Sequence, residues 1–280
     1  MTAWRGAHVL ITGAASGLGR LLALGAAARG ARLTLLDRDG PGLEAVRGVV
    51  ARAGGDAASF TVDLRDRAAF QAAAGQVLAS RGPVDILVNN AGIVTGKPLL
   101  ECSDEAIERT FQVNALALFW SARAFLPAMI ERGRGHVVTV ASAAGLGGTS
   151  RLTDYCASKF AAVGFDESLR LEMRRLGHPI RTTVVCPWYT DTGMFSGVRT
   201  RFPRLLPILR PEYVARRILD AVQADRRRLV LPRFVMAVLV ARILPPGLFD
   251  GVMRFFGVDR TMDEFAGRRN ETESTCDPAK

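Results

Sequence analysis

The chain has few residues of the kinds that bind metals or form disulfide bonds. Its 280 residues include only four cysteines and three histidines: Cys102, Cys156, Cys186 and Cys276, with His8, His136 and His178. No two cysteines form a Cys-x-x-Cys pair, and the histidines are widely dispersed, so zinc-ligand spacing is missing. We therefore expect no metal site, and thiols that are buried or incidental in a reducing compartment.

The sequence also lacks the apolar segments that direct a chain into or across a membrane. Residues 1–13 contain no apolar region of signal-peptide length and lead directly into a predicted strand. No run of 18 uninterrupted apolar residues occurs, so we predict no spanning helix. We expect a cytoplasmic protein and leave peripheral contact with a membrane open.

Aromatic residues are scarce, at 7% of the chain, but hydrophobic residues make up 49% and charged residues 23%. This composition supplies a large core and excludes global disorder. The formal net charge is +10, and residues 199–233 carry ten arginines against Glu212, Asp220 and Asp225, a net of +7. Such a segment forms either a solvated basic surface or a surface that attracts anionic lipid. Nucleic acid is not an expected partner.

Short runs rich in valine, isoleucine and leucine alternate with helical segments from residue 7 to about residue 231. Strands are predicted at 8–12, 32–37, 59–64, 84–90, 136–142, 180–187 and 228–232. Helices are predicted at 17–29, 41–53, 66–80, 104–131 and 153–176, and after Pro211. Buried strands that alternate with helices indicate an α/β fold with a doubly wound parallel sheet, Rossmann-like, which binds its ligand beyond the carboxyl ends of the strands.

We divide the chain into a catalytic domain and two C-terminal segments. Residues 1–232 are the predicted dinucleotide-binding catalytic domain, in which 191–210, with its glycines and prolines, are a candidate substrate lid. Residues 233–267 are an extension whose part 233–257 is apolar and interrupted by Pro245-Pro246. That part either packs on protein, the interpretation we favour, or contacts a membrane interface. Residues 268–280 are predicted to be disordered.

A glycine-rich turn, Thr12–Gly19, joins the first predicted strand to the first predicted helix. Glycines allow a tight turn and the close approach of a pyrophosphate, which the free N–H groups of the helix N-terminus then bind. Turns of this kind also occur in methyltransferases and in simple packing turns. The predicted cofactor contacts in this turn are Gly13, Ser16, Gly17, Leu18 and Gly19.

Asp37 ends the second predicted strand, where an acidic side chain accepts a hydrogen bond from a ribose 2′-hydroxyl and repels a 2′-phosphate. Asp37 therefore favours NAD over NADP. The neighbouring Arg38 is the counter-argument, because an arginine there can pair with a phosphate. Further predicted cofactor contacts lie at the ends of the third and fourth strands: Asp63, Leu64, Asn90, Ala91 and Gly92.

Tyr155 and Lys159 are four residues apart on one predicted helix, so they share a face. An adjacent ammonium stabilises a phenolate, which lowers the pKa of a tyrosine toward the range of a useful base. Ser142 ends the fifth predicted strand, where its hydroxyl can hold a substrate oxygen while Tyr155 transfers the proton. Asn114 lies in the long helix 104–131, where a buried amide can hold a water or simply pack.

These motifs occur in order: T-G-x-x-x-G-x-G at Thr12–Gly19, N-N-A-G at Asn89–Gly92, Asn114, Ser142 and Y-x-x-x-K at Tyr155–Lys159. Over about residues 6–232 the chain resembles the short-chain dehydrogenase/reductase family. The resemblance implies that Tyr155 is the acid/base, Ser142 orients the substrate oxygen, and Lys159 binds the nicotinamide ribose and lowers the tyrosine pKa. It implies that Asn114 supports a water relay and that homo-oligomers form. Tyr155 and Lys159 thus also count as cofactor contacts.

The family usually has Pro-Gly after the sixth strand, but this chain has Pro187-Trp188. Pro187, Thr190 and Thr192 still align with the usual nicotinamide contacts. The segments 191–195, 199–203, 209–212 and 231–233 resemble the branch of retinol dehydrogenases and 17β-hydroxysteroid dehydrogenase type 11. Members of that branch usually begin with a hydrophobic anchor, which we do not expect here because the first strand starts near residue 7.

The sequence thus predicts an NAD(H)-dependent oxidoreductase that interconverts a lipophilic alcohol, of retinoid, steroid or long-chain type, and its carbonyl. The alternative is a non-catalytic nucleotide-binding or lipid-surface protein of the same fold, which Trp188 and the apolar, basic C-terminal third suggest. A methyltransferase accounts for the glycine turn and Asp37 but leaves Ser142, Tyr155 and Lys159 unexplained.

Overall fold

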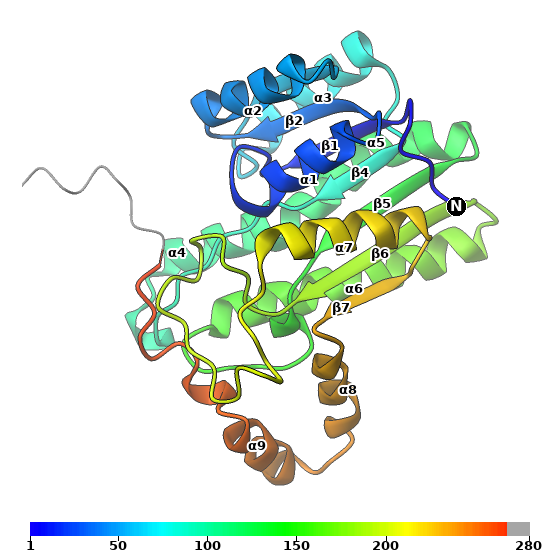
Figure 1. Ribbon diagram of the computed structural model, residues 1–280. Coiled ribbons are helices and arrows are strands. Elements are labelled where there is room, and N and C mark those ends of the chain that lie inside the picture. Colours follow the sequence, from blue (N-terminus) through cyan, green and yellow to red (C-terminus); the bar gives the residue numbers. More distant parts are fainter. Residues whose placement is uncertain (268–280) are drawn as a thin grey trace, which may run out of the picture.

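The computed structural model describes residues 1–267, so the tail 268–280, expected to be disordered, lies outside the described residues. A parallel sheet forms the centre of the molecule, with strand order β3-β2-β1-β4-β5-β6-β7 (Figure 1). The strands are β1 (His8–Thr12), β2 (Arg32–Asp37), β3 (Ala57–Thr61), β4 (Ile86–Asn89), β5 (Gly135–Val140), β6 (Ile180–Pro187) and β7 (Arg228–Leu231). The order reverses between β1 and β4, as expected for a doubly wound fold.

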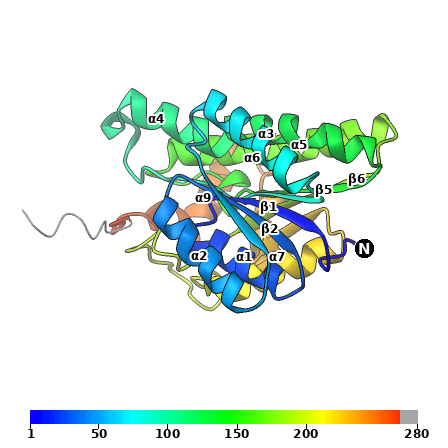
Figure 2. The same cartoon turned by 90° about the horizontal axis from the view of Figure 1, so that it is seen from above.

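Helices cover both faces of this sheet. They are α1 (Gly17–Ala27), α2 (Gly40–Arg52), α3 (Arg67–Arg81), α4 (Asp104–Phe111), α5 (Ala117–Glu131), α6 (Thr153–Arg175) and α7 (Pro211–Gln223). Figure 2 shows α1, α2 and α7 on one face and α3, α4, α5 and α6 on the other. The predicted Rossmann-like α/β fold is confirmed, and it places the loops after β1, β2, β4, β5 and β6 at one edge of the sheet.

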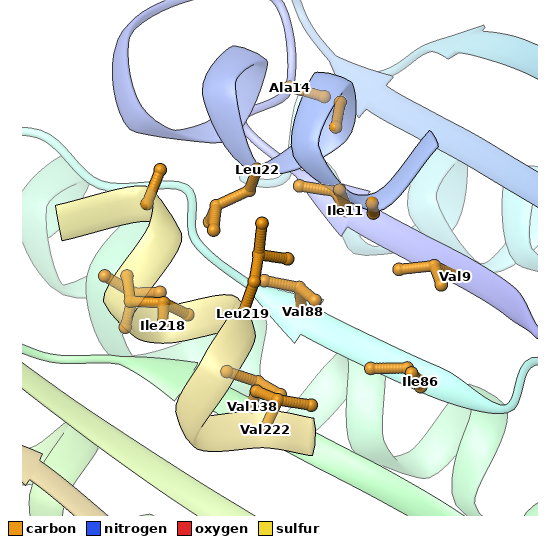
Figure 3. Close-up of a cluster of buried hydrophobic side chains, with 14 of the residues drawn as sticks. Val9, Ile11, Ala14, Leu22, Ile86, Val88, Val138, Ile218, Leu219 and Val222 are labelled. Atoms are coloured by element: carbon orange, nitrogen blue, oxygen red, sulfur yellow. The ribbon is translucent and has the colours of Figure 1, made fainter. Parts of the chain in front are cut away.

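The core between the sheet and the α1–α7 pair explains why the strands are uniformly apolar. Val9 and Ile11 of β1 and Val88 of β4 meet Leu22 of α1 and Leu219 of α7, all buried (Figure 3). A strand covered on both faces buries successive side chains in opposite directions, so it needs no polar alternation. Burial of each such side chain contributes about 1.5–3 kcal/mol, which fixes the strand ends that carry the site.

Several predicted elements differ from those observed. The strand expected at 84–90 is β4 at Ile86–Asn89, and the one expected at 136–142 is β5, which ends at Val140 and leaves Ser142 in the following loop. The third strand was expected at 59–64 but β3 ends at Thr61, because its partner β2 ends at Asp37, which pairs with Thr61. Asp63 and Leu64 therefore lie in the loop beyond the strand. The helix expected at 104–131 is continuous but contains a π-helical turn, Gln112–Leu116, between α4 and α5. Hydrophobic periodicity does not reveal a single wider turn.

The helical run Asp104–Glu131 is also long and apolar enough, by length and composition alone, to span a membrane. We predicted no spanning helix from the sequence because our criterion was an unbroken apolar run, which this segment does not contain. In the fold this run packs against β5 and contacts α3, and its side chains Phe125 and Met129 are fully buried. Core packing therefore accounts for part of its apolar composition, since 44% of its most apolar window is buried.

The apolar segment 233–257 forms short helical elements beside the sheet's last strand. They are a 3-10 turn (Arg233–Met236), α8 (Ala237–Ala241) and α9 (Pro246–Phe255), and a further 3-10 turn (Val258–Arg260) follows. Pro245 and Pro246 separate α8 from α9, since proline cannot continue a helix from the preceding turn. Residues 191–210 contain no helix or strand, and their ends are tied by a bridge between Thr190 and Leu209.

Candidate active site

A cleft of about 230 Å³ opens at the carboxyl ends of the strands, beside the switch in strand order between β1 and β4. It gathers nearly all of the residues that the sequence singled out. Those lining it are Gly13, Ser16, Gly17, Leu18, Asp37, Arg38, Asp63, Leu64, Asn90, Ala91, Gly92, Ser142, Tyr155, Lys159, Pro187, Thr190 and Thr192. Gly19 and Asn114 lie behind its wall instead.

The glycine turn forms a tightly closed cradle at the start of α1. Gly13 has φ of +67°, and a Cβ there would lie 2.8 Å from the Cα of Ala91. A Cβ on Gly19 would lie 1.9 Å from the carbonyl oxygen of Gly13. The side-chain amide of Asn90 donates to the carbonyl oxygens of Thr12 and Gly13 at 3.0 and 3.1 Å. The cradle therefore fits a pyrophosphate at a helix N-terminus, as a dinucleotide requires.

Asp37 is held in place at the end of β2. Its carboxylate accepts hydrogen bonds from the backbone N–H of Ala15 at 3.0 Å and of Asp39 at 3.2 Å. These bonds orient the carboxylate at the cleft wall. Arg38 is exposed, and among the described residues no acidic side chain forms an ion pair with it. Asp37, which favours NAD, and Arg38, which favours NADP, therefore line the same part of the cleft.

Asp63 has a partner that the sequence analysis missed. Arg65 pairs with it through two nitrogens, at 2.9 Å from Nε and 2.6 Å from Nη2 to Oδ2. The hydrogen bond from Arg65 holds the pKa of Asp63 below its usual range. Arg65 also lines the cleft. The signal available in the sequence was the Asp-x-Arg spacing immediately after a strand.

Tyr155 and Lys159 project from the first two turns of α6 and are almost fully buried. The ammonium of Lys159 donates a hydrogen bond to the carbonyl oxygen of Val140 at 3.0 Å. Burial lowers the pKa of Lys159 to about 8. Burial also raises the pKa of Tyr155, and a hydrogen bond with Ser142 opposes that rise. The cleft thus holds an ammonium, a phenol and an alcohol that can share a proton.

Asn114 lies in the π-helical turn and is buried. Its Oδ1 accepts from the backbone N–H of Ile93 at 2.8 Å, and its Nδ2 donates to the carbonyl oxygen of Ile93 at 2.9 Å. The amide also donates to Ser158 Oγ at 3.0 Å. In this arrangement Asn114 fastens the segment after β4 to α6. Its part in a water relay stays a prediction.

Trp188, which stands where the family has glycine, forms part of the inner wall of the cleft. Its backbone N–H donates to the carbonyl oxygen of Leu231 at 2.7 Å, so the backbone continues the pairing of β6 with β7. Its ring packs edge-on against Tyr189 with centroids 4.8 Å apart. Thr190 Oγ1 donates to the carbonyl oxygen of Trp188 at 3.1 Å. Trp188 lines both this cleft and a second cavity.

That second cavity, of about 110 Å³, is strongly apolar and adjoins the catalytic side chains. It shares Ser142, Tyr155, Trp188 and Phe195 with the nucleotide cleft. Phe195 packs edge-on against Tyr155 with centroids 5.7 Å apart. The remaining walls include Leu152, Leu206, Val235, Val238, Val252, Met253 and Phe256. Sequence reasoning did not identify these wall residues, although the apolar segment 233–257 contains most of them.

Comparison with known proteins identifies the class. The family model for short chain dehydrogenases matches residues 7–201. Epidermal retinol dehydrogenase 2 of Homo sapiens is 42% identical over 272 residues, covering 95% of this chain and 87% of that protein. Retinol dehydrogenase 10 of Homo sapiens is 41% identical over 293 residues, covering 94% and 85%. Short-chain dehydrogenase/reductase family 16C member 6 of Bos taurus is 43% identical over 271 residues, covering 96% and 86%.

Solved structures agree with this result. A short chain dehydrogenase/reductase from Burkholderia phymatum in complex with NAD has a TM-score of 0.79 at 28% identity, covering 87% of this chain and 95% of that one. A metagenomic short-chain oxidoreductase in complex with NADP has a TM-score of 0.68 at 33% identity, covering 81% and 97%. The chain belongs to the short chain dehydrogenase family. It is an oxidoreductase that acts on CH–OH groups and uses a nicotinamide dinucleotide.

Proposed function

We propose that this protein interconverts a lipophilic alcohol and its carbonyl, with NAD(H) as the cofactor and a retinoid, steroid or long-chain alcohol as the type of substrate. The observation that carries the proposal is the apolar cavity that meets the nucleotide cleft at Ser142 and Tyr155. A polar alcohol would gain little from a cavity walled by aliphatic and aromatic side chains. The relatives named as retinol dehydrogenases support the same substrate class.

The chain's own residues would handle the proton while the bound nicotinamide supplies or accepts hydride. In alcohol oxidation, the ionised Tyr155 oxygen takes the hydroxyl proton of the substrate. Ser142 orients the same substrate oxygen by a hydrogen bond. The hydrogen bond with Ser142 opposes the rise that burial causes in the pKa of Tyr155. The Lys159 ammonium, 5.6 Å from the centre of the Tyr155 ring, would stabilise the phenolate form further. Phe195 and Trp188 exclude water from the junction of the two cavities.

The apolar cavity is tested by filling it. A side chain at Gly147 would enter it, because a Cβ there lies 3.0 Å from Val238 and 3.3 Å from Met253. Gly147→Leu is expected to raise the KM for a long-chain alcohol by roughly tenfold or more, with little effect on a short alcohol. Gly148→Leu is the matched control, since its Cβ meets nothing within 4 Å. No turnover of any alcohol by protein that binds cofactor would favour the non-catalytic alternative.

The preference for NAD rests on the oriented carboxylate of Asp37, which would repel a 2′-phosphate. Asp37→Ser is expected to shift the ratio of kcat/KM for NADP over NAD upward by at least about tenfold, because a like-charge contact is removed. Arg38→Ala is the companion variant. A wild-type preference for NADP that Arg38→Ala abolishes would reverse the assignment.

We also infer a homo-oligomer located in the cytoplasm. Leu116 and Phe119 are 42% and 45% exposed on the helical run, and Phe119 packs edge-on against Phe165 of α6 at 5.0 Å. Neighbouring exposed apolar side chains on one helical run are typical of a protein interface. Light scattering of wild type and Phe119→Glu tests this, and a wild-type monomer at all concentrations would contradict it.

A further inference from the structure

A short C-terminal segment, residues 258–266, packs against residues 191–210, which we call the lid. Figure 1 shows this segment in orange and red beside the yellow-green loops of the lid. Its Met262 is fully buried, in one hydrophobic cluster with Tyr155 and Tyr189. We call residues 258–266 the C-terminal strap. The strap therefore has a fixed place in the fold, next to the catalytic tyrosine.

Backbone hydrogen bonds and an ion pair join the strap to the lid. The N–H of Arg199 donates to the carbonyl oxygen of Thr261 at 3.2 Å, and the N–H of Ala266 donates to that of Ser196 at 2.9 Å. The guanidinium of Arg199 also pairs with Glu264 at 2.9 Å. Because the lid contains no helix or strand of its own, its conformation depends on the segments that it contacts.

Two glycines allow the strap to lie this close to its neighbours. Gly197 in the lid has φ of +87°, and a Cβ there would lie 2.0 Å from the carbonyl oxygen of Glu264. Gly96, in the loop after β4, has φ of +71°, and a Cβ there would lie 2.0 Å from Cε1 of Phe265. The ring of Phe265 therefore rests directly on the backbone of that loop, where no larger residue fits.

Phe265 stands between this loop and the lid. The loop is fastened to α6, because the hydroxyl of Thr95 donates to Oδ1 of the buried Asp154 at 2.8 Å. On its other side, the ring of Phe265 lies 6.4 Å from that of Phe195, centroid to centroid. Phe195 in turn packs edge-on against Tyr155. A chain of contacts thus runs from an anchored loop through Phe265 to the lid residue that covers the catalytic tyrosine.

We propose that Phe265 is a positioning residue, which holds the lid closed so that Phe195 stays over Tyr155 at the junction of the nucleotide cleft and the apolar cavity. Phe265 lines neither of these cavities, so it acts through Phe195. An open lid would admit water to the junction and loosen the alcohol against Tyr155. Lid closure stands on the contacts alone, whereas its effect on turnover rests on the proposed function.

Lid closure is measured by limited digestion of the full-length protein with trypsin, followed by mass spectrometry. The lid offers cleavage sites at Arg201 and Arg204. Phe265→Ala is expected to be cut there at least about tenfold faster than wild type, because cleavage follows the population of the open state. Leu248→Ala, at a 62% exposed position on α9, is the matched control and should be cut at the wild-type rate. An unchanged rate in Phe265→Ala would overturn the proposal.

The contact with the loop after β4 is tested from its other side. Gly96→Ala places a methyl group where the ring of Phe265 lies, so it is expected to speed cleavage of the lid as Phe265→Ala does. The double variant should then be cut no faster than the faster single variant, because both changes break the same contact. Independent, multiplying effects would overturn the role of this contact.

Positioning is measured by turnover of one lipophilic alcohol at saturating NAD. Phe265→Ala is expected to lose about tenfold in kcat, because the alcohol is less well oriented. Cofactor binding, followed by fluorescence titration, should stay as in wild type. Phe265→Leu keeps an apolar side chain against the loop and should recover most of the loss. Wild-type kcat in Phe265→Ala would overturn the positioning role.

The two measurements separate the failure of this proposal from that of the proposed function. Wild-type protein that turns over no alcohol would contradict the proposed function, while faster cleavage of the Phe265→Ala lid would still support closure by the strap. Turnover by wild type with equal cleavage of wild type and Phe265→Ala would leave the proposed function supported and overturn closure.

Discussion

The ammonium of Lys159 lies 5.6 Å from the centre of the Tyr155 ring, and both side chains are buried on one face of α6. The hydrogen bond from Lys159 to the carbonyl oxygen of Val140 ties this pair to the end of β5, which also carries Ser142 into the cleft. Because the lysine is nearly fully buried, its charge acts on the phenol with little screening by water. The following predictions begin from this pair.

Tyr155→Phe removes the only proton-transferring atom of the tyrosine and keeps its ring. We expect kcat/KM to fall by about 10²- to 10⁴-fold, the usual contribution of a positioned acid or base. Cofactor binding, measured by fluorescence titration, should persist. Tyr213→Phe at the start of α7 lies outside both cavities and serves as the control. Equal activity of Tyr155→Phe and wild type would refute the assigned proton transfer.

Lys159→Met removes the charge that favours the phenolate. The rate of alcohol oxidation should rise with pH as Tyr155 ionises, and in the variant this rise should occur at higher pH because the tyrosine pKa is no longer lowered. Lys159 itself titrates with a pKa of about 8, so it is cationic at neutral pH. The measurement is kcat/KM against pH for both proteins. Profiles that coincide would exclude an effect of Lys159 on Tyr155.

Gly19→Ala places a methyl group 1.9 Å from the carbonyl oxygen of Gly13 and 2.6 Å from Nδ2 of Asn90. The backbone of Gly13 and the side chain of Asn90 cannot move away from this methyl group without a cost in free energy. We therefore expect a loss of about 1–3 kcal/mol in the free energy of unfolding, together with weaker cofactor binding. Gly75→Ala on α3, where a Cβ meets nothing within 4 Å, should instead stabilise by about 0.5–1 kcal/mol. Urea denaturation compares the two, and similar stability of both variants would show that the cradle is not tightly packed.

His136 makes the stability depend on pH. Burial lowers its pKa to about 4, with Asp225 raising and Arg181 lowering it, while its ring accepts or donates to Thr2 and Thr183. Between about pH 6.5 and pH 4 the unfolded chain binds a proton that the folded chain does not, so stability falls as the pH falls through this range. The loss attributable to His136 is about 3 kcal/mol at most. Denaturation of wild type and His136→Gln across this range measures it, and parallel pH dependences would contradict the assignment.

Much of the fold and of the nucleotide site was predictable because the responsible patterns are local. The strands at 8–12, 32–37 and 180–187 match β1, β2 and β6, since short runs rich in apolar and β-branched residues predict buried strands. The turn Thr12–Gly19 was recognisable because its conformation needs glycine at fixed positions. The fold then brought Tyr155, Lys159 and Ser142 to one cleft, as their placement on strand ends and one helix face predicted.

Features that depend on contacts between distant segments were not predictable in the same way. The π-helical turn at Gln112–Leu116 accompanies the bonds between Asn114 and Ile93, which helical periodicity cannot indicate. The end of β3 was misplaced because its extent depends on the length of β2. The pairing of Asp63 with Arg65 is local, and it was overlooked because Asp63 was considered only as a cofactor contact at the end of the third strand.

The sequence by itself determined the strand–helix alternation, the glycine turn and the set of proton-transferring side chains, because each is encoded by spacing within a short segment. Tertiary structure decided how the apolar segment 233–257 is used. Its inward side chains close a cavity against Trp188 and Leu206, and its outward side chains remain exposed. Which side of a short amphipathic helix is buried depends on the surface it meets, and that surface is assembled from strands and loops far away in the chain.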